Sequence, residues 1–282
     1  MRLQSPSQHF QIRRLMLLLL GLITLTYLGM CGLIYLRQEQ MIFFPRQDPP
    51  DTSYDFGRPV SEVWLPVAGA RLHALWFQVP EPQGVILYLH GNADTLRNWG
   101  PEAASLTDFG YDLFIVDYRG YGQSSGTING EAQLHADMDV VYGWVRERYP
   151  ADQIVVYGRS LGTGLATRLA AINQPGLLIL ESPYYSMELL ARRQVPWAPL
   201  FLLKYPLRSY RWIGQVQSPV VIFHGTADEL IPFEDSQRLA TYVTAPLTFY
   251  ALEGGGHGGL QRFTLYHEGL QAALAARHQL TQ

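Results

Sequence analysis

The sequence predicts an α/β protein, a mostly parallel eight-stranded sheet flanked by helices, preceded by one membrane-spanning helix. Three observations predict this architecture. Short apolar runs alternate with longer amphipathic ones over residues 61–282, the connections between them are short, and an uncharged apolar run lies near the N-terminus. Strand, helix and strand joined by short connections form right-handed crossovers, which pair the strands in parallel. We therefore expect a single α/β domain at 61–282 behind an anchor.

The composition is that of a protein with one large core. The chain has 282 residues, of which 48% are hydrophobic, and its formal net charge is -3. This charge gives no reason to expect a nucleic-acid partner. The single cysteine, Cys31, excludes an intramolecular disulfide and a CxxC metal site. Composition leaves the oligomeric state open.

The N-terminal region predicts a tail at 1–14 and a transmembrane helix at 15–36. The run 15–36 contains no charged residue, and as a helix it spans roughly 33 Å against a hydrocarbon core of roughly 30 Å. A cleaved signal peptide is the alternative, but this run is long for one and lacks an alanine for cleavage. Acylation of Cys31 as a lipoprotein would place the large Met30 where a small residue is needed.

Basic residues flank this run unevenly. The arginines before it are Arg2, Arg13 and Arg14, and those after it are Arg37 and Arg46. Because positive charge is retained on the cytoplasmic side, this bias places the N-terminus in the cytoplasm. The domain at 61–282 is then expected outside the cytoplasm, facing the periplasm if the membrane is a bacterial inner membrane.

The following residues predict a linker and then the elements of the sheet. Residues 37–60 combine an apolar patch at 41–44 with four prolines, which indicates a structureless connector. Short apolar runs predict strands at 62–66, 72–79, 84–89, 113–117, 154–157, 177–180, 220–223 and 247–252. Amphipathic runs predict helices at 131–149, 161–173, 233–243 and 263–277.

Residues 183–215 interrupt the alternation and predict an inserted cap. About thirty residues lack strand character there, which is long for a connection. The segment is rich in aromatic and basic side chains and has one acidic residue, Glu188. Two interpretations stay open: the aromatic residues fill the cap's own core, or they form an acyl-binding lid that also faces anionic headgroups.

Ser160 is the candidate nucleophile. It lies in GRSLG at 158–162, a G-x-S-x-G motif between the apolar run 154–157 and a predicted helix. A strand-to-helix turn of this kind presents a serine hydroxyl for attack. A second match, GQSSG at 122–126, lies in a glycine-rich loop with no helix directly after it. We interpret that match as a turn.

A serine nucleophile requires a histidine base, and His257 is the candidate. Four histidines follow Ser160 in the chain. His267 and His278 belong to the last predicted helix, and His224 ends an apolar strand, where a hydrogen-bonded core role is expected. His257 lies among glycines in a loop after the last predicted strand, and glycines give such a loop the freedom to direct the ring toward Ser160.

Asp228 is the candidate acid, since in hydrolases with this motif the order along the chain is serine, acid, histidine. It follows the strand at 220–223, at the carboxyl edge of the sheet. Glu229 is the alternative acid. Asp235 begins a helix, where capping explains it, and Glu181 at the end of the sixth strand is a weaker candidate.

The loop at 90–93 is the candidate oxyanion site. It has the sequence HGNA and follows the strand at 84–89. In hydrolases with this motif, such a loop donates one backbone N–H, and the residue after the nucleophile donates another. These donors would be Asn92 and Leu161. His90 ends a strand, and we expect it to shape the loop rather than to act as a base.

Four segments and His257 carry a resemblance to a known family. The segments are LHGNA at 89–93, DYRGYG at 117–122, GRSLG at 158–162 and DELIP at 228–232. From about residue 61 onward the chain resembles membrane-anchored α/β-hydrolases, grouped with serine-aminopeptidase-like sequences and eukaryotic α/β-hydrolase-domain proteins. The resemblance implies the α/β-hydrolase fold and hydrolysis of esters or thioesters, often of lipids or acylated molecules, without a cofactor.

We therefore expect a serine hydrolase that uses Ser160, His257 and Asp228 on a small-molecule or lipid-like acyl substrate, with neither cofactor nor metal. An aminopeptidase-like amide hydrolase would use the same three residues. A non-catalytic, membrane-anchored binding protein is an alternative of another class, although it would have no need for all three. A metal hydrolase would need His224, Asp228 and His257 to converge, and these lack the HExxH setting.

Overall fold

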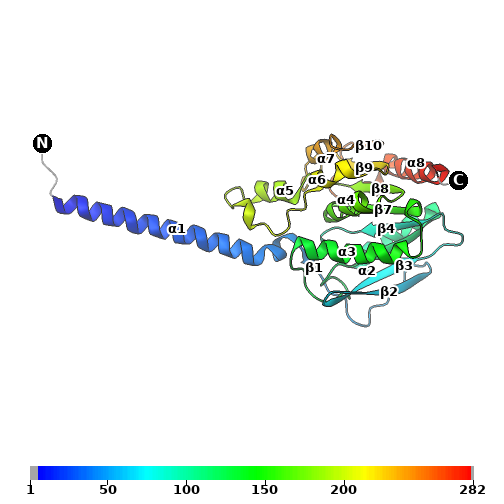
Figure 1. Ribbon diagram of the computed structural model, residues 1–282, viewed down its shortest axis with the longest axis horizontal. Helices are drawn as coiled ribbons and strands as arrows, with labels where there is room; N and C mark the ends of the chain where they lie inside the picture. The colour runs from blue at the N-terminus through cyan, green and yellow to red at the C-terminus, as the bar shows by residue number, and fades with distance from the viewer. Residues whose placement is uncertain (1–5, 281–282) are drawn as a thin grey trace.

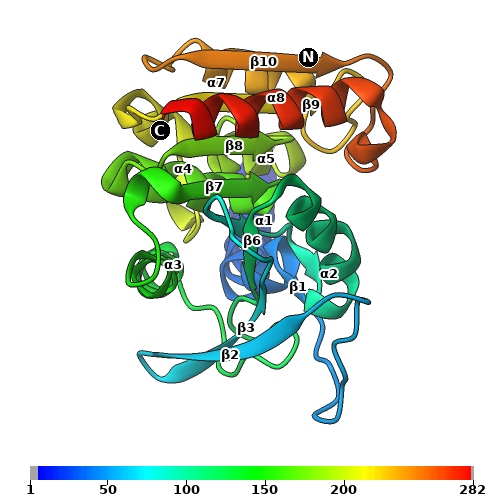
Figure 2. The ribbon, with the colours of Figure 1, turned by 90° about the vertical axis from the view of Figure 1, so that its right-hand side faces the viewer.

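The computed structural model describes residues 6–280. Over these residues, eight strands form one sheet with helices against both faces (Figures 1 and 2). The strands are β2 (Val60–Val67), β3 (Ala70–Phe77), β4 (Val85–Leu89), β6 (Asp112–Val116), β7 (Ile154–Arg159), β8 (Leu177–Glu181), β9 (Val220–Gly225) and β10 (Leu247–Leu252). Their order is β10-β9-β8-β7-β4-β6-β3-β2. Only the pairings of β3 with β2 and β6 are antiparallel among them.

The central strands are apolar on both sides because helices cover both faces of the sheet. Every residue of β4, β6, β7 and β8 is buried. The edge strands β2 and β10 have several exposed residues instead. The predicted α/β architecture is confirmed, and each predicted strand agrees with an observed one to within two residues at either end.

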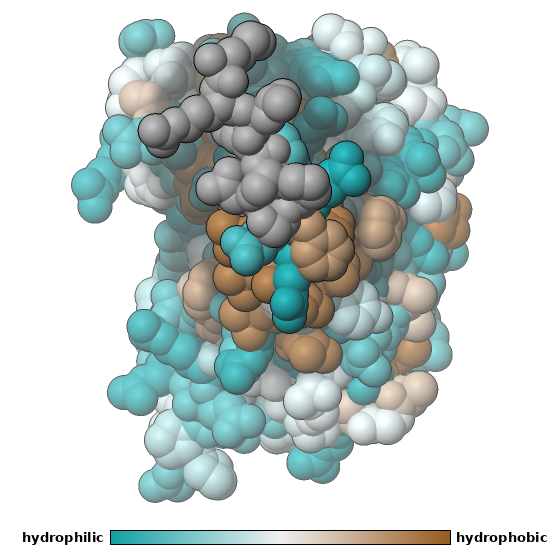
Figure 3. All heavy atoms as spheres, turned by 90° about the vertical axis from the view of Figure 1, so that its left-hand side faces the viewer, coloured by the Kyte–Doolittle hydropathy of each residue, from teal (hydrophilic) through white to brown (hydrophobic). Residues whose placement is uncertain are grey.

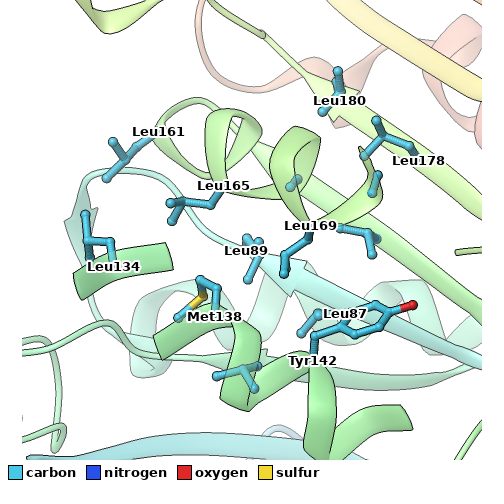
Figure 4. Close-up of a cluster of buried hydrophobic side chains, with 14 of the residues drawn as sticks. Leu87, Leu89, Leu134, Met138, Tyr142, Leu161, Leu165, Leu169, Leu178 and Leu180 are labelled. Carbon is cyan, nitrogen blue, oxygen red and sulfur yellow. The ribbon is translucent and has the colours of Figure 1, made fainter. Parts of the chain in front are cut away.

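Two sets of helices enclose the sheet. They are α2 (Leu96–Ala104) and α8 (Thr264–Leu280) against one face, and α3 (Glu131–Arg146) and α4 (Leu161–Asn173) against the other. Figure 4 shows the core on the face that α3 and α4 cover, where leucines of α4, β4 and β8 gather with Met138 of α3. α7 (Phe233–Ala240) adds Leu239 to this core. α2 was not predicted, because Gly100 and Pro101 interrupt its pattern.

A single helix, α1 (Pro6–Ile42), precedes the sheet domain. It projects away from the domain as a long rod (Figure 1). Within the described residues it is the one helix that is long and apolar enough to cross a membrane, with a mean hydropathy of 2.2 and 6% of its most apolar window buried. It extends beyond the predicted span 15–36 at both ends. Residues 1–5 of the predicted tail lie outside the described residues.

The predicted linker is not structureless throughout. Residues 37–42 complete α1, and β1 (Phe44–Pro45) then pairs in parallel with β5 (Ala93–Asp94). This pairing joins the end of the apolar helix to the loop after β4. A pair of two-residue strands far apart in the chain leaves no periodic pattern, which is why the sequence indicated only a connector.

The segment 183–215 connects β8 to β9 through short helical elements. They are α5 (Met187–Gln194), η3 (Leu200–Leu202), α6 (Ser209–Trp212) and η4 (Ile213–Gln215). Its aromatic residues divide into two groups. Tyr184 and Tyr205 are fully buried, whereas Trp197 and Phe201 are exposed. The first group packs into the main core of the domain and not into a core of the cap's own, and the second group leaves an apolar surface.

Candidate active site

Ser160 lies on a sharp turn between β7 and α4, as the motif predicts. Its backbone has φ 51° and ψ -116°, in a region that residues other than glycine rarely adopt. The glycines on either side permit this turn: a Cβ on Gly158 would lie 2.7 Å from the Gly162 carbonyl oxygen, and a Cβ on Gly162 would lie 2.0 Å from the Leu89 carbonyl oxygen. The turn brings Ser160 to the carboxyl edge of the sheet.

The structure brings His257 and Asp228 together with Ser160. His257 Nε2 lies 2.9 Å from Ser160 Oγ, and His257 Nδ1 lies 2.8 Å from Asp228 Oδ2. Because a carboxylate only accepts, Nδ1 carries the proton and Nε2 is free to accept from the serine hydroxyl. The three side chains therefore form a hydrogen-bonded chain from acid to base to hydroxyl.

Asp228 is held in place as an anion. Its Oδ1 accepts from the backbone N–H groups of Leu230 and Ile231, each at 2.9 Å. Burial raises the pKa of Asp228, but hydrogen bonds from His224, His257 and the Ile231 backbone outweigh that effect and hold the pKa well below its usual value. The side chain is therefore ionised at neutral pH and stabilises a protonated His257.

His224 is a second imidazole against the same carboxylate, a contact that the sequence analysis did not predict. Its ring is fully buried, and Nε2 lies 2.9 Å from the Ile231 carbonyl oxygen and 3.2 Å from Asp228 Oδ2. Since both neighbours are acceptors, Nε2 carries the proton. The expected hydrogen-bonded core role of His224 thus includes support of Asp228. Its position four residues before Asp228 was the available signal.

An apolar pocket of about 350 Å³ opens beside Ser160. Asn92 and Leu161, the predicted oxyanion donors, both line it. The other lining residues come from α1 and β1 (Met41, Ile42, Phe44), from the segment 183–215 (Tyr184, Met187, Leu190, Arg193, Gln194) and from the loop after β9 (Glu229, Leu230, Ile231, Pro232). The pocket is thus walled by three parts of the chain that are distant in sequence.

The end of α1 is bonded directly to the candidate oxyanion loop. The Phe44 N–H donates to the Asn92 carbonyl oxygen at 2.9 Å, and Asn92 Nδ2 donates to the Ile42 carbonyl oxygen at 3.2 Å. Tyr121 also donates its hydroxyl to the Asn92 carbonyl oxygen at 2.8 Å. The position of this loop therefore depends on residues 42–44.

The second motif match is a structural turn. Ser124 is buried, its hydroxyl donates to the Asp117 carbonyl oxygen at 2.7 Å, and it accepts from the His73 N–H at 2.8 Å. His90 lies beneath the oxyanion loop, with Nδ1 2.7 Å from the Gly91 carbonyl oxygen and Nε2 3.4 Å from Asp117 Oδ1. Neither residue is bonded to the chain formed by Ser160, His257 and Asp228.

None of the other acidic residues considered is hydrogen-bonded to His257. Glu229 lines the pocket and is exposed. Asp235 at the start of α7 is buried against Arg193, with Arg193 Nη1 2.9 Å from Asp235 Oδ2. Glu181 accepts from the Tyr157 hydroxyl at 2.5 Å on the far side of the nucleophile turn.

A buried ionic cluster behind Ser160 was missed by the sequence analysis. Arg159, the residue before Ser160, contacts Glu102 of α2 and lies with Nε 3.2 Å from Glu181 Oε1. Gln261, four residues after His257, donates to Glu102 at 2.5 Å. Burial lowers the pKa of Arg159, but Glu181, Tyr88 and Glu102 raise it above its usual value. The cluster joins β7, β8, α2 and the histidine loop.

The structure supports the metal-hydrolase alternative only in that the required side chains lie close together. His224 and His257 do converge on Asp228, but each imidazole is hydrogen-bonded to the carboxylate. Across residues 6–280, no group of three histidine, cysteine, aspartate or glutamate side chains has the arrangement of a metal site.

Comparison with known proteins places the chain in a family. A family model described as "Serine aminopeptidase, S33" matches residues 80–215. An uncharacterized protein of Mycobacterium tuberculosis (strain H37Rv) is 30% identical over 84% of this chain and 86% of its own. Alpha/beta hydrolase domain-containing protein 17B of Xenopus laevis is 32% identical over 70% of this chain and 68% of its own.

Solved structures show the same fold. An esterase of Pyrococcus furiosus aligns with a TM-score of 0.66 at 16% identity, covering 84% of this chain and 97% of its own. Acetyl xylan esterase 1 of Thermoanaerobacterium aligns with a TM-score of 0.65 at 17% identity, covering 80% and 86%. The structures show the fold, and the similarity to the Xenopus laevis protein shows that the chain belongs to the α/β-hydrolase family.

Proposed function

We propose that this protein is a membrane-anchored serine hydrolase that cleaves carboxylic ester or thioester bonds in lipid-like or acylated substrates. One observation carries the proposal: the hydrogen-bonded chain Ser160–His257–Asp228 opens onto an apolar pocket whose wall includes the end of α1. The reacting hydroxyl and an apolar helix end meet at one site. An acyl chain in a nearby membrane is the substrate that fits both.

The geometry supports acyl transfer in two steps. His257 Nε2 takes the proton of the Ser160 hydroxyl as Oγ attacks the carbonyl carbon, and the Asp228 anion stabilises the resulting imidazolium. The N–H groups of Asn92 and Leu161 hold the negative oxygen. His257 then protonates the departing alcohol or thiol, which leaves an acyl-Ser160. Water, deprotonated by His257, attacks the acyl carbon; the bond to Ser160 Oγ breaks, His257 returns the proton to Oγ, and the acid is released.

The pocket supports an acyl substrate rather than a highly charged one. Most of its lining is apolar, with aliphatic side chains such as Ile42, Leu190 and Ile231. Arg193 is also present, but Asp235 neutralises it through two hydrogen bonds. Binding energy for such a pocket comes from the removal of apolar surface from water.

The helix α1 acts in this proposal as an uncleaved anchor, with the sheet domain outside the cytoplasm. Its apolar length supports spanning, and the arginines before residue 15 support the orientation. Residues 38–44 support retention of the helix in the mature protein, because they pack on the domain and bond the oxyanion loop. Loss of these residues would remove part of the pocket.

Amide cleavage is the second candidate. The matching family model carries the name of a serine aminopeptidase, and Glu229 at the pocket provides a carboxylate for a substrate ammonium group. The same three residues would act on an aminoacyl amide.

A substrate panel separates the two candidates. Purified full-length protein in detergent micelles is given acyl esters, acyl thioesters and aminoacyl amides, with Ser160→Ala as the matched control. We expect turnover of esters or thioesters, lost in Ser160→Ala. Turnover of amides alone would overturn the lipid-ester proposal, and Glu229→Gln would then raise KM for those amides.

A further inference from the structure

An apolar segment of the region 183–215 lies along α1. Residues 195–203 have the sequence VPWAPLFLL, nine uncharged residues, and none of them is buried. Phe201 is 85% exposed and Trp197 is 41% exposed. An uninterrupted apolar stretch on the surface marks a site of contact with another apolar phase.

Three hydrogen bonds and one aromatic contact fix this segment against α1. The Tyr27 hydroxyl donates to the Trp197 carbonyl oxygen at 3.2 Å, and the two rings meet edge to face with centroids 6.3 Å apart. Further along α1, Gln38 Nε2 donates to the Leu202 carbonyl oxygen at 3.0 Å, and Gln38 Oε1 accepts from the Lys204 N–H at 2.7 Å. Figure 1 shows this region beside the C-terminal half of α1.

The position of Tyr27 sets the depth of the segment. Tyr27 is ten residues before Arg37, or about 15 Å along the helix axis. It therefore lies near the middle of the run 15–36, which has to fill a hydrocarbon core of roughly 30 Å. A segment bonded to Tyr27 therefore lies in the same medium as the run 15–36. If α1 crosses the bilayer, residues 195–203 are within it.

Charge agrees with this placement, and backbone bonding agrees with it for part of the segment. Cations bound the apolar stretch on both sides, Arg192 and Arg193 before it and Lys204 after it, and Lys204 Nζ lies 2.9 Å from Glu39 Oε1 on α1. Cations at such boundaries reach the headgroup layer. Irregular backbone in lipid has to satisfy its own polar groups. Of the N–H groups in 195–203, those of residues 195, 198, 202 and 203 are bonded to nearby carbonyls, Pro196 and Pro199 have none, and those of residues 197, 200 and 201 have no backbone partner.

The surface seen from the N-terminal side of α1 is consistent with one apolar contact area. Figure 3 shows brown, apolar residues gathered in the middle of the view. The surface around them is mostly polar. The exposed large apolar side chains of the described residues are concentrated in α1, with Trp197 and Phe201 added by the segment 195–203.

We infer that residues 195–203 form a second membrane-embedded element, which enters the hydrocarbon of the bilayer alongside α1. Its partner is the acyl region of a phospholipid bilayer. This inference rests on the proposed anchor, not on the proposed chemistry. The two elements hold the pocket at Ser160 at a fixed height above the membrane. The segment 195–203 directly follows α5, and α1 leads into residues 41–44, and both α5 and residues 41–44 line the pocket.

Tryptophan quenching by brominated lipids tests the inference. The chain has six tryptophans, and none lies in the run 15–36. Full-length protein is reconstituted in phosphatidylcholine vesicles with and without bromine on the acyl chains. We expect bromine to quench the wild-type fluorescence, and we expect Trp197→Phe to remove most of this quenching. Trp64→Phe is the matched control on β2 and should leave it unchanged.

The variant pair at Phe201 gives a second measurement. A carboxylate is costly in hydrocarbon, so Phe201→Asp should lower the quenching of Trp197 whereas Phe201→Leu should preserve it. Phe201 is exposed, so neither change removes a contact of the core. Equal quenching in both variants would overturn the inference.

The anchor is tested separately by Leu20→Trp in the Trp197→Phe background. Quenching of the tryptophan introduced there, together with equal quenching of the wild type and of Trp197→Phe alone, would leave the anchor intact and overturn the second element alone. A Leu20→Trp variant that bromine fails to quench would overturn both. Ser160→Ala should behave as the wild type in every measurement, which separates membrane insertion from the chemistry.

Discussion

Asp228 shows how single side chains set the candidate site. Its carboxylate receives four hydrogen bonds, from the imidazoles of His224 and His257 and from the N–H groups of Leu230 and Ile231. The sequence predicted Asp228 from its place after a strand and from chain order. It did not predict that two imidazoles pair with this carboxylate, because that contact depends on how the loop after β9 turns back.

The lowered pKa of Asp228 predicts a pH-dependent stability. A carboxyl has a reference pKa of about 3.9 when unfolded, and the folded value is well below this. The stabilisation is therefore complete above about pH 5 and is lost as pH falls toward the folded pKa. Between pH 5 and pH 2, the free energy of unfolding should fall more steeply for the wild type than for Asp228→Asn. Urea denaturation at several pH values measures both slopes, and parallel slopes would refute this account.

At the level of secondary-structure elements, apolar periodicity predicted the sheet well and the joints between elements poorly. The strands were predicted because each is a short apolar run, and α4 was predicted from Leu161 to Asn173 as observed. The ionic cluster around Arg159 could not be predicted, because Glu102, Glu181 and Gln261 come from separate parts of the chain. Buried ion pairs of this kind leave no local pattern.

Arg159 is expected to act as a positioning residue for the turn that holds Ser160. Arg159→Leu leaves Glu102 and Glu181 without their cation, and loss of one partner of a buried ion pair typically costs about 3–5 kcal/mol. Arg168→Leu is the control, because its pair with Asp139 on the surface should be worth about 1 kcal/mol or less. Thermal unfolding measures the stability of both variants, and steady-state kinetics measure kcat and KM separately for each. A positioning role requires a fall in kcat at temperatures where Arg159→Leu is still folded.

Two helical glycines give opposite predictions for the same substitution. A Cβ on Gly162 would lie 2.0 Å from the Leu89 carbonyl oxygen, so Gly162→Ala has to move backbone and should destabilise by about 1–3 kcal/mol. Gly143 on α3 has nothing within 4 Å of such a Cβ, and Gly143→Ala should stabilise by about 0.5–1 kcal/mol. Unfolding free energies measure both. The same sign in both variants would contradict the packing described here.

For the whole molecule, the main finding is that α1 is continuous with the candidate active site. The sequence predicted an anchor and a domain with a structureless connector between them. In the structure, residues 38–44 pack on the segment 183–215, bond the candidate oxyanion loop and line the pocket. The connector was misjudged because its contacts are with residues some 50 to 165 positions away.

A pair of truncations tests this coupling. Removal of residues 1–36 takes away the membrane span but keeps Ile42 and Phe44, so turnover of a short, water-soluble ester should stay close to that of the full chain. Removal of residues 1–46 also deletes the bonds to Asn92, and displacement of the loop should lower kcat/KM by about 10–100-fold. Equal activity of two folded truncations would show that residues 37–46 only connect.

Covalent labelling by a fluorophosphonate tests the central claim most directly. Full-length protein is treated with the probe, digested and mapped by mass spectrometry, and the two G-x-S-x-G serines, Ser160 and Ser124, serve as site and internal control. The hydrogen-bonded chain through His257 to Asp228 predicts phosphonylation of Ser160 alone, and its loss in His257→Gln. An unlabelled Ser160 in protein that unfolds cooperatively, or labelling that survives in Ser160→Ala, would contradict the assignment of Ser160 as the nucleophile.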